Sequence, residues 1–189
     1  AAGRDVIREH LQNLSPDDTA SIIYTSGTTG EAKGVMLTHD NFLFNVQRCI
    51  EVLPFTEEDR FLSFLPLSHV LERMAGYYLP LLVGCQIAYA ESLDTVAENM
   101  MEAHPTIMVS VPRLYEKIYV RVMDSIQGGS AVKQKLFHWA VQTGEKYFNT
   151  IRDKKSVSPL LRMQFALGDK LVLSKIRART GDRLRFFIS

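Results

Sequence analysis

The chain has 189 residues, of which 46% are hydrophobic and 23% are charged, and its formal net charge is +1. This composition is typical of a globular protein with one sizeable core. It excludes a membrane-spanning helix, because no apolar run reaches ~18 residues, and the N-terminus lacks the basic-then-apolar layout of a secretory signal.

The charges are divided unevenly along the chain. Residues 113–185 contain sixteen Lys or Arg and six Asp or Glu, a net of +10, whereas the remainder contains six and fifteen, a net of −9. The two parts can neutralise each other in the folded chain. Alternatively, the basic part attracts phospholipid headgroups, acyl-CoA phosphates or an acidic partner. The sequence leaves both interpretations open.

Predicted strands and helices alternate from residue 20 to residue 126. Apolar runs predict strands at 20–25, 35–38, 60–65, 86–90 and 106–110. Helical spacing predicts helices at 4–14, 40–52, 68–83 and 92–104, and one that begins near Arg113. Asp40 is the expected cap of the second helix, and Gly84 is expected to end the third. The first of these strands is expected to be buried.

After Arg113 the alternation stops. Long helices are predicted at 131–152 and 159–179, and a last strand at 184–188. The whole pattern predicts an α/β fold, a mostly parallel sheet with helices on both faces plus a long helical insertion. Ligands of such sheets bind at the carboxyl ends of the strands, so the loops that follow Thr25, Leu65 and Ser110 are expected to share one edge.

The most informative stretch is residues 24–35, Tyr-Thr-Ser-Gly-Thr-Thr-Gly-Glu-Ala-Lys-Gly-Val. Glycines let a backbone approach an anion closely, and hydroxyl and N–H groups donate to it. Lys33 adds a positive charge that a phosphate can use. The spacing is not that of the common P-loop, G-x-x-x-x-G-K-[ST]. The stretch predicts a loop that binds a polyphosphate; the simpler alternative is a polar turn between two strands.

This stretch resembles the phosphate-binding signature of the adenylate-forming superfamily, which includes acyl-CoA synthetases, luciferases and the adenylation domains of peptide synthetases. It departs from the usual pattern at Ala32, where many members have proline. The resemblance implies that ATP phosphates are bound by Thr25, Ser26, Gly27, Thr28, Thr29, Gly30 and Lys33.

Two further segments extend the resemblance to the long-chain fatty-acid branch of the superfamily. In Pro-Leu-Ser-His-Val-Leu-Glu-Arg, His69 matches a residue that lines the acyl site; a surface or helix-capping histidine is the alternative. In Val-Pro-Arg-Leu-Tyr, the acyl-binding residues would be Val111, Pro112 and Tyr115, with Tyr115 as an aromatic gate. The alternative is a proline-initiated helix whose tyrosine packs on the core.

The resemblance implies ATP-dependent activation of a long-chain fatty acid to an acyl-adenylate, followed by transfer to coenzyme A. ATP, Mg²⁺ and coenzyme A are the expected substrates and cofactors. Residues 1–189 would be one fragment of the N-terminal ATP- and acyl-binding domain. It comprises a core at 20–112, a basic helical insertion at 113–183 and a next strand at 184–189. Because the later family motifs are absent, we expect no catalytic residue and no activity from this chain alone.

No metal site is expected, because adjacent carboxylates point in different directions and Glu57, Glu58 and Asp59 are predicted to form a solvated turn. Cys49 and Cys85 indicate free thiols in a reducing compartment. The expected location is cytoplasmic, with peripheral membrane contact and a homodimer left open, and no nucleic-acid partner is expected. The sequence also leaves open a ligase that uses a carrier protein, a luciferase-like enzyme, or a non-catalytic nucleotide- or membrane-binding module.

Overall fold

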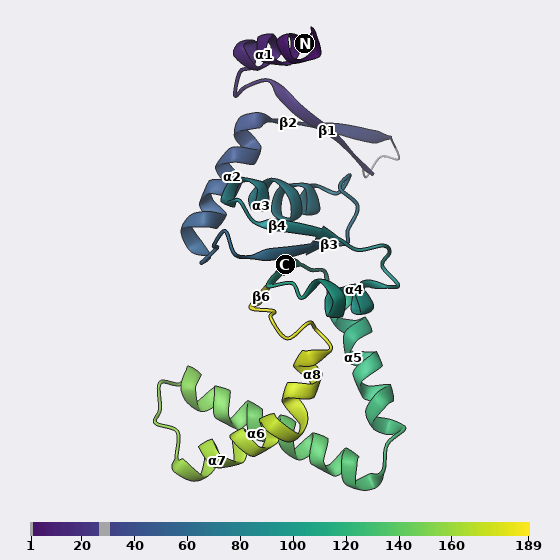
Figure 1. Cartoon of the computed structure of the whole chain (residues 1–189), viewed down its shortest axis with the longest axis vertical. Helices are drawn as coiled ribbons and strands as arrows, with labels where there is room; N and C mark the ends of the chain where they lie inside the picture. Colours follow the sequence, from purple (N-terminus) through teal and green to yellow (C-terminus); the bar gives the residue numbers. More distant parts are fainter. Residues whose placement is uncertain (1, 27–30) are drawn as a thin grey trace.

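The computed structural model describes residues 2–26 and 31–189, whose strands form two sheets (Figure 1). In the first, β1 (Thr19–Ser26) and β2 (Ala32–Thr38) pair as an antiparallel hairpin. The second is a parallel sheet in the order β4-β3-β5-β6, formed by β3 (Arg60–Ser63), β4 (Gln86–Tyr89), β5 (Ile107–Val109) and β6 (Phe186–Ile188). The predicted α/β fold with a parallel sheet is therefore confirmed.

Helices cover both faces of the parallel sheet. On one face lie α2 (His39–Val52), the π-helix η1 (Glu72–Tyr78) and α3 (Leu79–Val83); on the other lie α4 (Val96–Ala103) and α5 (Pro112–Gln127). Successive residues of a strand point to opposite faces. Accordingly, Phe61 of β3 packs in the cluster with α2 and α3, whereas Leu62 packs in the cluster with α4 and α5. Each helical layer buries its apolar stripe against the sheet.

A helical block follows α5 and returns the chain to β6. It consists of α6 (Ala131–Arg152), α7 (Pro159–Gly168), the π-helix η2 (Asp169–Leu173) and α8 (Ser174–Ala178). In Figure 1 this block lies apart from the hairpin, at the opposite end of the molecule. No helix within residues 2–26 and 31–189 combines the length and hydropathy that a bilayer crossing needs.

Local signals explain most helix boundaries. α1 (Ala2–Asn13) matches the first predicted helix, and α6 has the predicted bounds because the Ser130 hydroxyl accepts from the Lys133 N–H at its start. The cap of α2 is Thr38 instead of the expected Asp40, and it forms a capping box with Asn41. Gly84 ends α3 with φ of 86°, as predicted, since glycine adopts this left-handed conformation without strain.

The prediction of a buried strand at residues 20–25 is wrong. Ile22 and Tyr24 are 53% and 72% exposed, and β1 is not part of the parallel sheet. β1 pairs with β2 because a short connection between consecutive strands permits only antiparallel pairing, whereas a parallel pair needs a long crossover. The described residues leave the apolar side of this hairpin uncovered.

The prediction of a solvated turn at residues 57–59 is wrong for its last residue. Asp59 is 2% exposed, and Arg185 Nη1 lies 2.7 Å from both of its carboxylate oxygens. Burial alone would raise the pKa of Asp59, but hydrogen bonds from Thr106, Arg185 and the Thr56 N–H outweigh it and hold this pKa below its ordinary value. This ion pair joins the chain entering β3 to the chain entering β6.

Candidate nucleotide and acyl site

The hairpin brings the first and last residues of the predicted phosphate loop together. Thr25 of β1 and Lys33 of β2 are direct cross-strand partners, and the Thr25 hydroxyl lies 3.5 Å from the Lys33 carbonyl oxygen. Side chains of directly opposed residues lie on the same face of an antiparallel pair. A threonine hydroxyl and a lysine ammonium, both exposed, therefore flank one side of the loop where it leaves the hairpin.

The other predicted phosphate-binding positions are described only in part. Ser26 ends β1 opposite Ala32. Gly27, Thr28, Thr29 and Gly30 lie outside the described residues. Their assignment to ATP phosphates stays a prediction.

The loop after β3 presents His69 at the surface. The His69 N–H donates to the Pro66 carbonyl at 2.8 Å, and its Nδ1 accepts from the Leu71 N–H at 3.3 Å. The second contact satisfies a backbone donor at the start of the following helix, which is the helix-capping role considered as an alternative. Acceptance at Nδ1 puts the proton of a neutral imidazole on Nε2. A role of His69 with an acyl substrate stays a prediction.

The short loop after β5 leads into α5 and carries Val111. Because β3 and β5 pair in parallel, the loops that carry His69 and Val111 leave the same edge of the sheet, as predicted. The loop after Thr25, predicted to share this edge, follows a strand of the separate hairpin instead. Pro112 is the first residue of α5, and its preceding residue Val111 has the extended conformation expected before proline. Tyr115 is 38% exposed and packs edge to face on Phe187 of β6, with ring centroids 5.1 Å apart.

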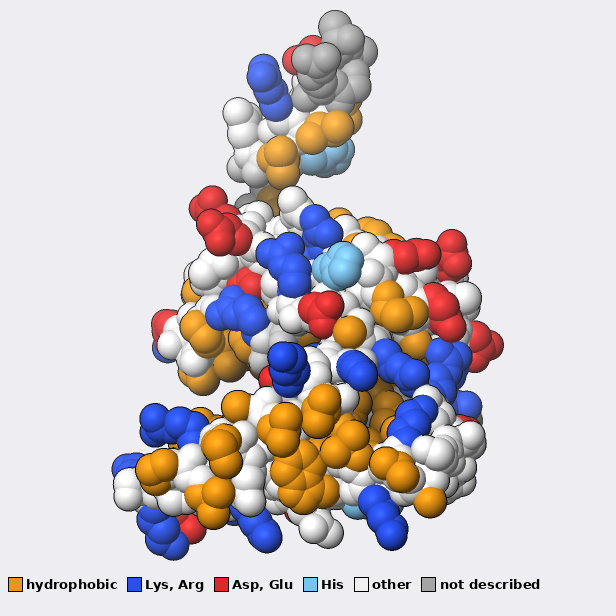
Figure 2. Space-filling view, turned by 60° about the horizontal axis from the view of Figure 1, so that its bottom comes forward, with side chains coloured by type: hydrophobic (Ala, Val, Ile, Leu, Met, Phe, Trp, Pro, Cys, Tyr) orange, Lys and Arg blue, Asp and Glu red, His pale blue; other side chains and the backbone are white. Residues whose placement is uncertain are grey.

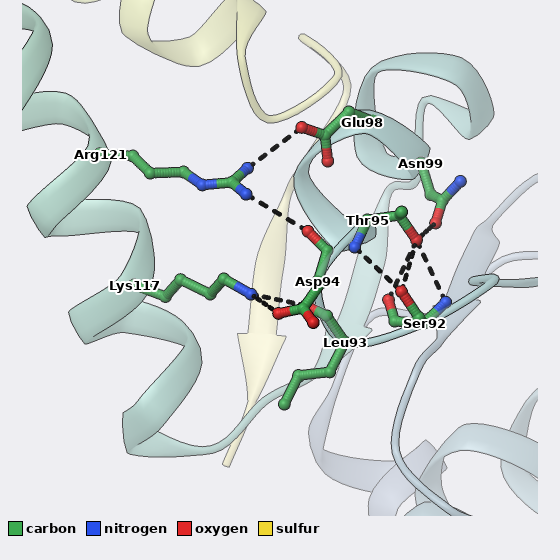
Figure 3. A network of polar contacts seen from close by, with 8 residues as sticks. All are labelled: Ser92, Leu93, Asp94, Thr95, Glu98, Asn99, Lys117 and Arg121. Carbon is green, nitrogen blue, oxygen red and sulfur yellow. Dashed lines mark hydrogen bonds and ion pairs between the residues drawn. The ribbon is translucent and has the colours of Figure 1, made fainter.

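α5 is anchored to α4 and to the segment before it, which fixes the direction of the helix that carries Tyr115. Figure 3 shows Lys117 reaching Asp94 in this segment and Arg121 reaching Glu98 on α4. Lys117 Nζ donates to Asp94 Oδ1 at 2.8 Å, and Arg121 Nη1 lies 3.3 Å from Glu98 Oε1. The Lys117 hydrogen bond lowers the pKa of Asp94. Both pairs are solvent-exposed, so they orient the helix more than they stabilise the fold.

A buried carboxylate under the edge of the sheet was missed at the level of the sequence. Glu72 in η1 is fully buried, and neither of its oxygens has a hydrogen-bond partner with good geometry among the described residues. Burial raises the pKa of Glu72, and contacts with the Ser63 hydroxyl and the Phe64 N–H offset part of this effect. A Cβ at Gly76 would overlap this carboxylate, so glycine makes room for it. The sequence contained no signal for this burial beyond an apolar run around Glu72.

The comparisons with known proteins agree with this fold. A parallel sheet covered by helices on both faces defines an α/β protein, a class that binds its ligands at the carboxyl edge of the sheet. The family model for the AMP-binding enzyme matches residues 2–182. The chain belongs to this family.

Fatty-acid–CoA ligases are among its relatives. The chain is 36% identical over 178 residues to a Mycobacterium tuberculosis protein provisionally named fatty-acid–CoA ligase fadD11, and covers 31% of that protein and 93% of itself. It is 35% identical over 175 residues to peroxisomal long chain acyl-CoA synthetase 6 of Arabidopsis thaliana, covering 92% of itself and 23% of that protein. The chain thus spans about a quarter to a third of the length of these relatives.

Solved structures with a similar fold include two ligases with AMP bound. The O-succinylbenzoate coenzyme A synthetase of Bacillus subtilis in complex with AMP matches 56% of this chain and 22% of its own, with 28% identity and a TM-score of 0.50. A malonyl-CoA ligase with methylmalonyl-CoA and AMP bound matches 55% and 23%, with 27% identity and a TM-score of 0.50. Both are adenylate-forming enzymes, in accordance with the resemblance seen in the sequence.

Proposed function

We propose that residues 1–189 are part of the N-terminal domain of a longer ligase that activates a long-chain fatty acid with ATP and transfers it to coenzyme A. Within this part, residues 20–112 are the α/β core, residues 113–183 the basic helical insertion and residues 184–189 the next strand. The observation that carries the proposal is the cross-strand pair of Thr25 and Lys33 at the end of a hairpin whose connecting loop has the phosphate-binding signature. The name of the Mycobacterium tuberculosis relative supports a fatty-acid substrate, and that of the Arabidopsis thaliana relative supports a long-chain one.

In the proposed reaction, a fatty-acid carboxylate oxygen attacks the α-phosphorus of ATP and pyrophosphate leaves with the electron pair of the broken P–O bond. The coenzyme A thiol then attacks the acyl carbon, a C–S bond forms, and AMP leaves. Negative charge develops on phosphate oxygens in the first step, so positioned hydroxyl, N–H and ammonium donors stabilise its transition state. Lys33 and the signature loop would supply such donors.

The acyl group would enter from the same edge of the sheet. His69 lies on the loop after β3 and Tyr115 lies in the first turns of α5, just after the adjacent strand β5, so both can face one substrate. Tyr115 rests on Phe187 and is partly exposed, which would allow a rotation of the ring without opening the core. We therefore assign His69 to positioning the substrate and Tyr115, with Val111 and Pro112, to the acyl passage.

The described residues hold no complete set of protein ligands for Mg²⁺. Among residues 2–26 and 31–189, no group of three His, Cys, Asp or Glu side chains could hold a metal ion. No step is therefore derived through a metal bound by this part of the chain.

The test uses the complete ligase that contains residues 1–189. Acyl-dependent release of pyrophosphate is measured with ATP and palmitate, followed by an acceptor panel of coenzyme A and a carrier-protein thiol. The proposal expects pyrophosphate release and palmitoyl-CoA. Release of pyrophosphate with transfer only to the carrier protein would show that the acyl acceptor is a carrier-protein thiol and not coenzyme A. No release of pyrophosphate with any fatty acid would contradict the ligase proposal.

The helical block supports a second proposal, peripheral contact with an anionic membrane. Exposed apolar side chains on α6 and α7 include Phe148 (60%), Leu160 (60%) and Met163 (64%). Figure 2 shows hydrophobic side chains gathered on this block with Lys and Arg around them. Basic residues around an apolar surface favour anionic lipid headgroups. Vesicles rich in phosphatidylserine should bind the chain and release it in high salt; equal binding to neutral vesicles, or self-association instead, would contradict this contact.

A further inference from the structure

Arg73 joins the hairpin to the loop that carries His69. It lies on η1, where its Nε donates to the Leu67 carbonyl at 2.8 Å and its Nη1 donates to the Ser21 hydroxyl. Ser21 belongs to β1 and is buried, although it is 52 residues away in sequence. One guanidinium therefore contacts the stem of the phosphate loop and the loop after β3 at the same time.

The geometry of arginine suits this bridge better than that of lysine. Its planar guanidinium holds several donors in a fixed fork, whereas a lysine ammonium is a point charge on a flexible stem. The neighbouring Glu72 is fully buried under the sheet, and successive residues of a helix point in different directions. η1 is thus held against the sheet on one side while Arg73 reaches outward to β1. Single π-helical turns of this kind are found frequently at functional sites.

Few other hydrogen bonds hold the hairpin in place. At its base, the His39 N–H donates to the Asp18 carbonyl and the Asp40 N–H donates to the Pro16 carbonyl. Among the described residues, no other side-chain hydrogen bond joins β1 to an element outside the hairpin. The contact between Arg73 and Ser21 therefore restrains how β1 is oriented relative to the parallel sheet.

Because Ser21 lies near the base of the hairpin, a small rotation at this contact displaces the far end of the hairpin by a larger distance. Ser26 follows Ser21 by five positions, which is about 17 Å at the usual rise of a strand. A rotation of about 4° at the base would displace the end of the hairpin by roughly 1 Å, and a misplacement of this size can cost about 100-fold in rate.

We propose that Arg73 is a positioning residue of the ligase: it holds the phosphate-loop hairpin at a defined distance from the His69 loop, so that ATP and the acyl carboxylate meet in the reactive geometry. This inference rests on the proposed function. Arg73 itself touches neither substrate in this account. It acts through Ser21 on the nucleotide side and through Leu67 on the acyl side.

The test compares three variants of the complete ligase. Ser21→Ala removes only the hydrogen bond from Arg73 to the hairpin, so kcat/KM for ATP should fall by about 10- to 100-fold while KM for palmitate stays near the wild-type value. Arg73→Gln removes the hydrogen bonds to both Ser21 and Leu67, and it should change both kcat/KM for ATP and KM for palmitate. Arg73→Lys should restore less than a tenth of the lost kcat/KM. The control Arg48→Gln, on the exposed part of α2, should match the wild type.

Two readouts separate a positioning role from a merely structural one. If Arg73 acts through Ser21, the double variant with Ser21→Ala and Arg73→Gln should have the same kcat/KM for ATP as Arg73→Gln alone, because the two residues share one interaction. Hydrogen exchange of the β1–β2 amides should also become at least tenfold faster in Arg73→Gln and in Ser21→Ala, with the exchange of α2 unchanged. Additive losses in the double variant, or unchanged exchange of the hairpin, would overturn the inference.

The result also distinguishes this inference from the proposed function. If the wild type is active and Arg73→Gln has the same kinetics or the same hairpin exchange as the wild type, the positioning role alone is refuted. A wild type without acyl-dependent pyrophosphate release would refute the proposed function, and with it the role of Arg73 in a reaction, even if the hairpin exchanges faster in the variant.

Discussion

The ion pair between Asp59 and Arg185 allows a quantitative prediction about how the sheet is closed. The two residues are 126 positions apart and join the start of β3 to the start of β6. Arg185 also donates to the Pro54 carbonyl at 2.6 Å, and the Thr106 hydroxyl donates to Asp59 at 2.7 Å. Asp59 thus ties together the segments before β3, β5 and β6, and the carboxyl ends of β3 and β5 lead to the proposed acyl site.

We expect Asp59→Asn to destabilise the fold by about 2–3 kcal/mol at pH 7. Breaking a fully buried ion pair costs about 3–5 kcal/mol. The Arg185 side chain is 38% exposed, so water can solvate it in the variant and the cost is reduced. Asparagine has one accepting oxygen, so it can keep the hydrogen bond from Thr106 or the one from the Thr56 N–H, but not both. For a chain of this size the change corresponds to a decrease of about 4–12 °C in the midpoint of unfolding.

The pH dependence provides an independent check of the same pair. The pKa of Asp59 is lowered in the folded state, so its contribution to stability is present above the ordinary carboxyl pKa and is lost as the pH falls through the lowered value. Thermal unfolding is followed by circular dichroism from neutral pH down to about pH 2.5. The midpoint of unfolding should decrease less on acidification in Asp59→Asn than in the wild type.

The matched control is Asp94→Asn, which also removes a carboxylate from an ion pair. The Asp94 side chain is 94% exposed, so its midpoint should stay within error of the wild type. If Asp59→Asn unfolds at the same temperature as Asp94→Asn, the buried pair does not hold β6 in the sheet and the reasoning is refuted.

Three further predictions concern single residues or the chain as a whole. Because burial raises the pKa of Glu72, its stabilising contribution is present at low pH and lost as the pH rises through the raised value, so Glu72→Gln should unfold at a higher temperature than the wild type at pH 7; a lower midpoint would contradict this. In the complete ligase, Tyr115→Ala should change the preference for acyl-chain length more than KM for ATP, with the exposed Tyr119→Ala as control; the reverse pattern would exclude the gate. Residues 1–189 alone should release no pyrophosphate from ATP and palmitate, and measurable release would show that this part is sufficient for the first step.

Local patterns predicted the elements whose boundaries depend on neighbouring residues. Ser130 and the apolar spacing behind it defined α6, and Gly84 ended α3 because its backbone conformation suits glycine. The parallel sheet followed from the alternation of strands and helices. The edge shared by the His69 and Val111 loops followed from it, because β3 and β5 are neighbours.

Features that depend on distant partners could not be predicted in this way. An apolar run at residues 20–25 indicates a strand but does not say which strand it pairs with, so the hairpin was mistaken for a buried strand of the main sheet. The carboxylate of Asp59 was expected to be solvated because its partner, Arg185, lies at the other end of the chain. The same reason explains why no role was assigned to Arg73, whose contacts with Ser21 and Leu67 exist only in the folded chain.

The central claim is that the loop at the end of the hairpin binds the phosphates of ATP. The most direct measurement is acyl-dependent exchange of pyrophosphate into ATP by the complete ligase, compared between the wild type, Lys33→Ala and the control Lys135→Ala on α6. The account predicts that Lys33→Ala raises KM for ATP or lowers the exchange rate by roughly tenfold or more, because a charge-assisted contact to phosphate is lost, while Lys135→Ala exchanges at the wild-type rate. Wild-type exchange kinetics in Lys33→Ala would contradict the claim.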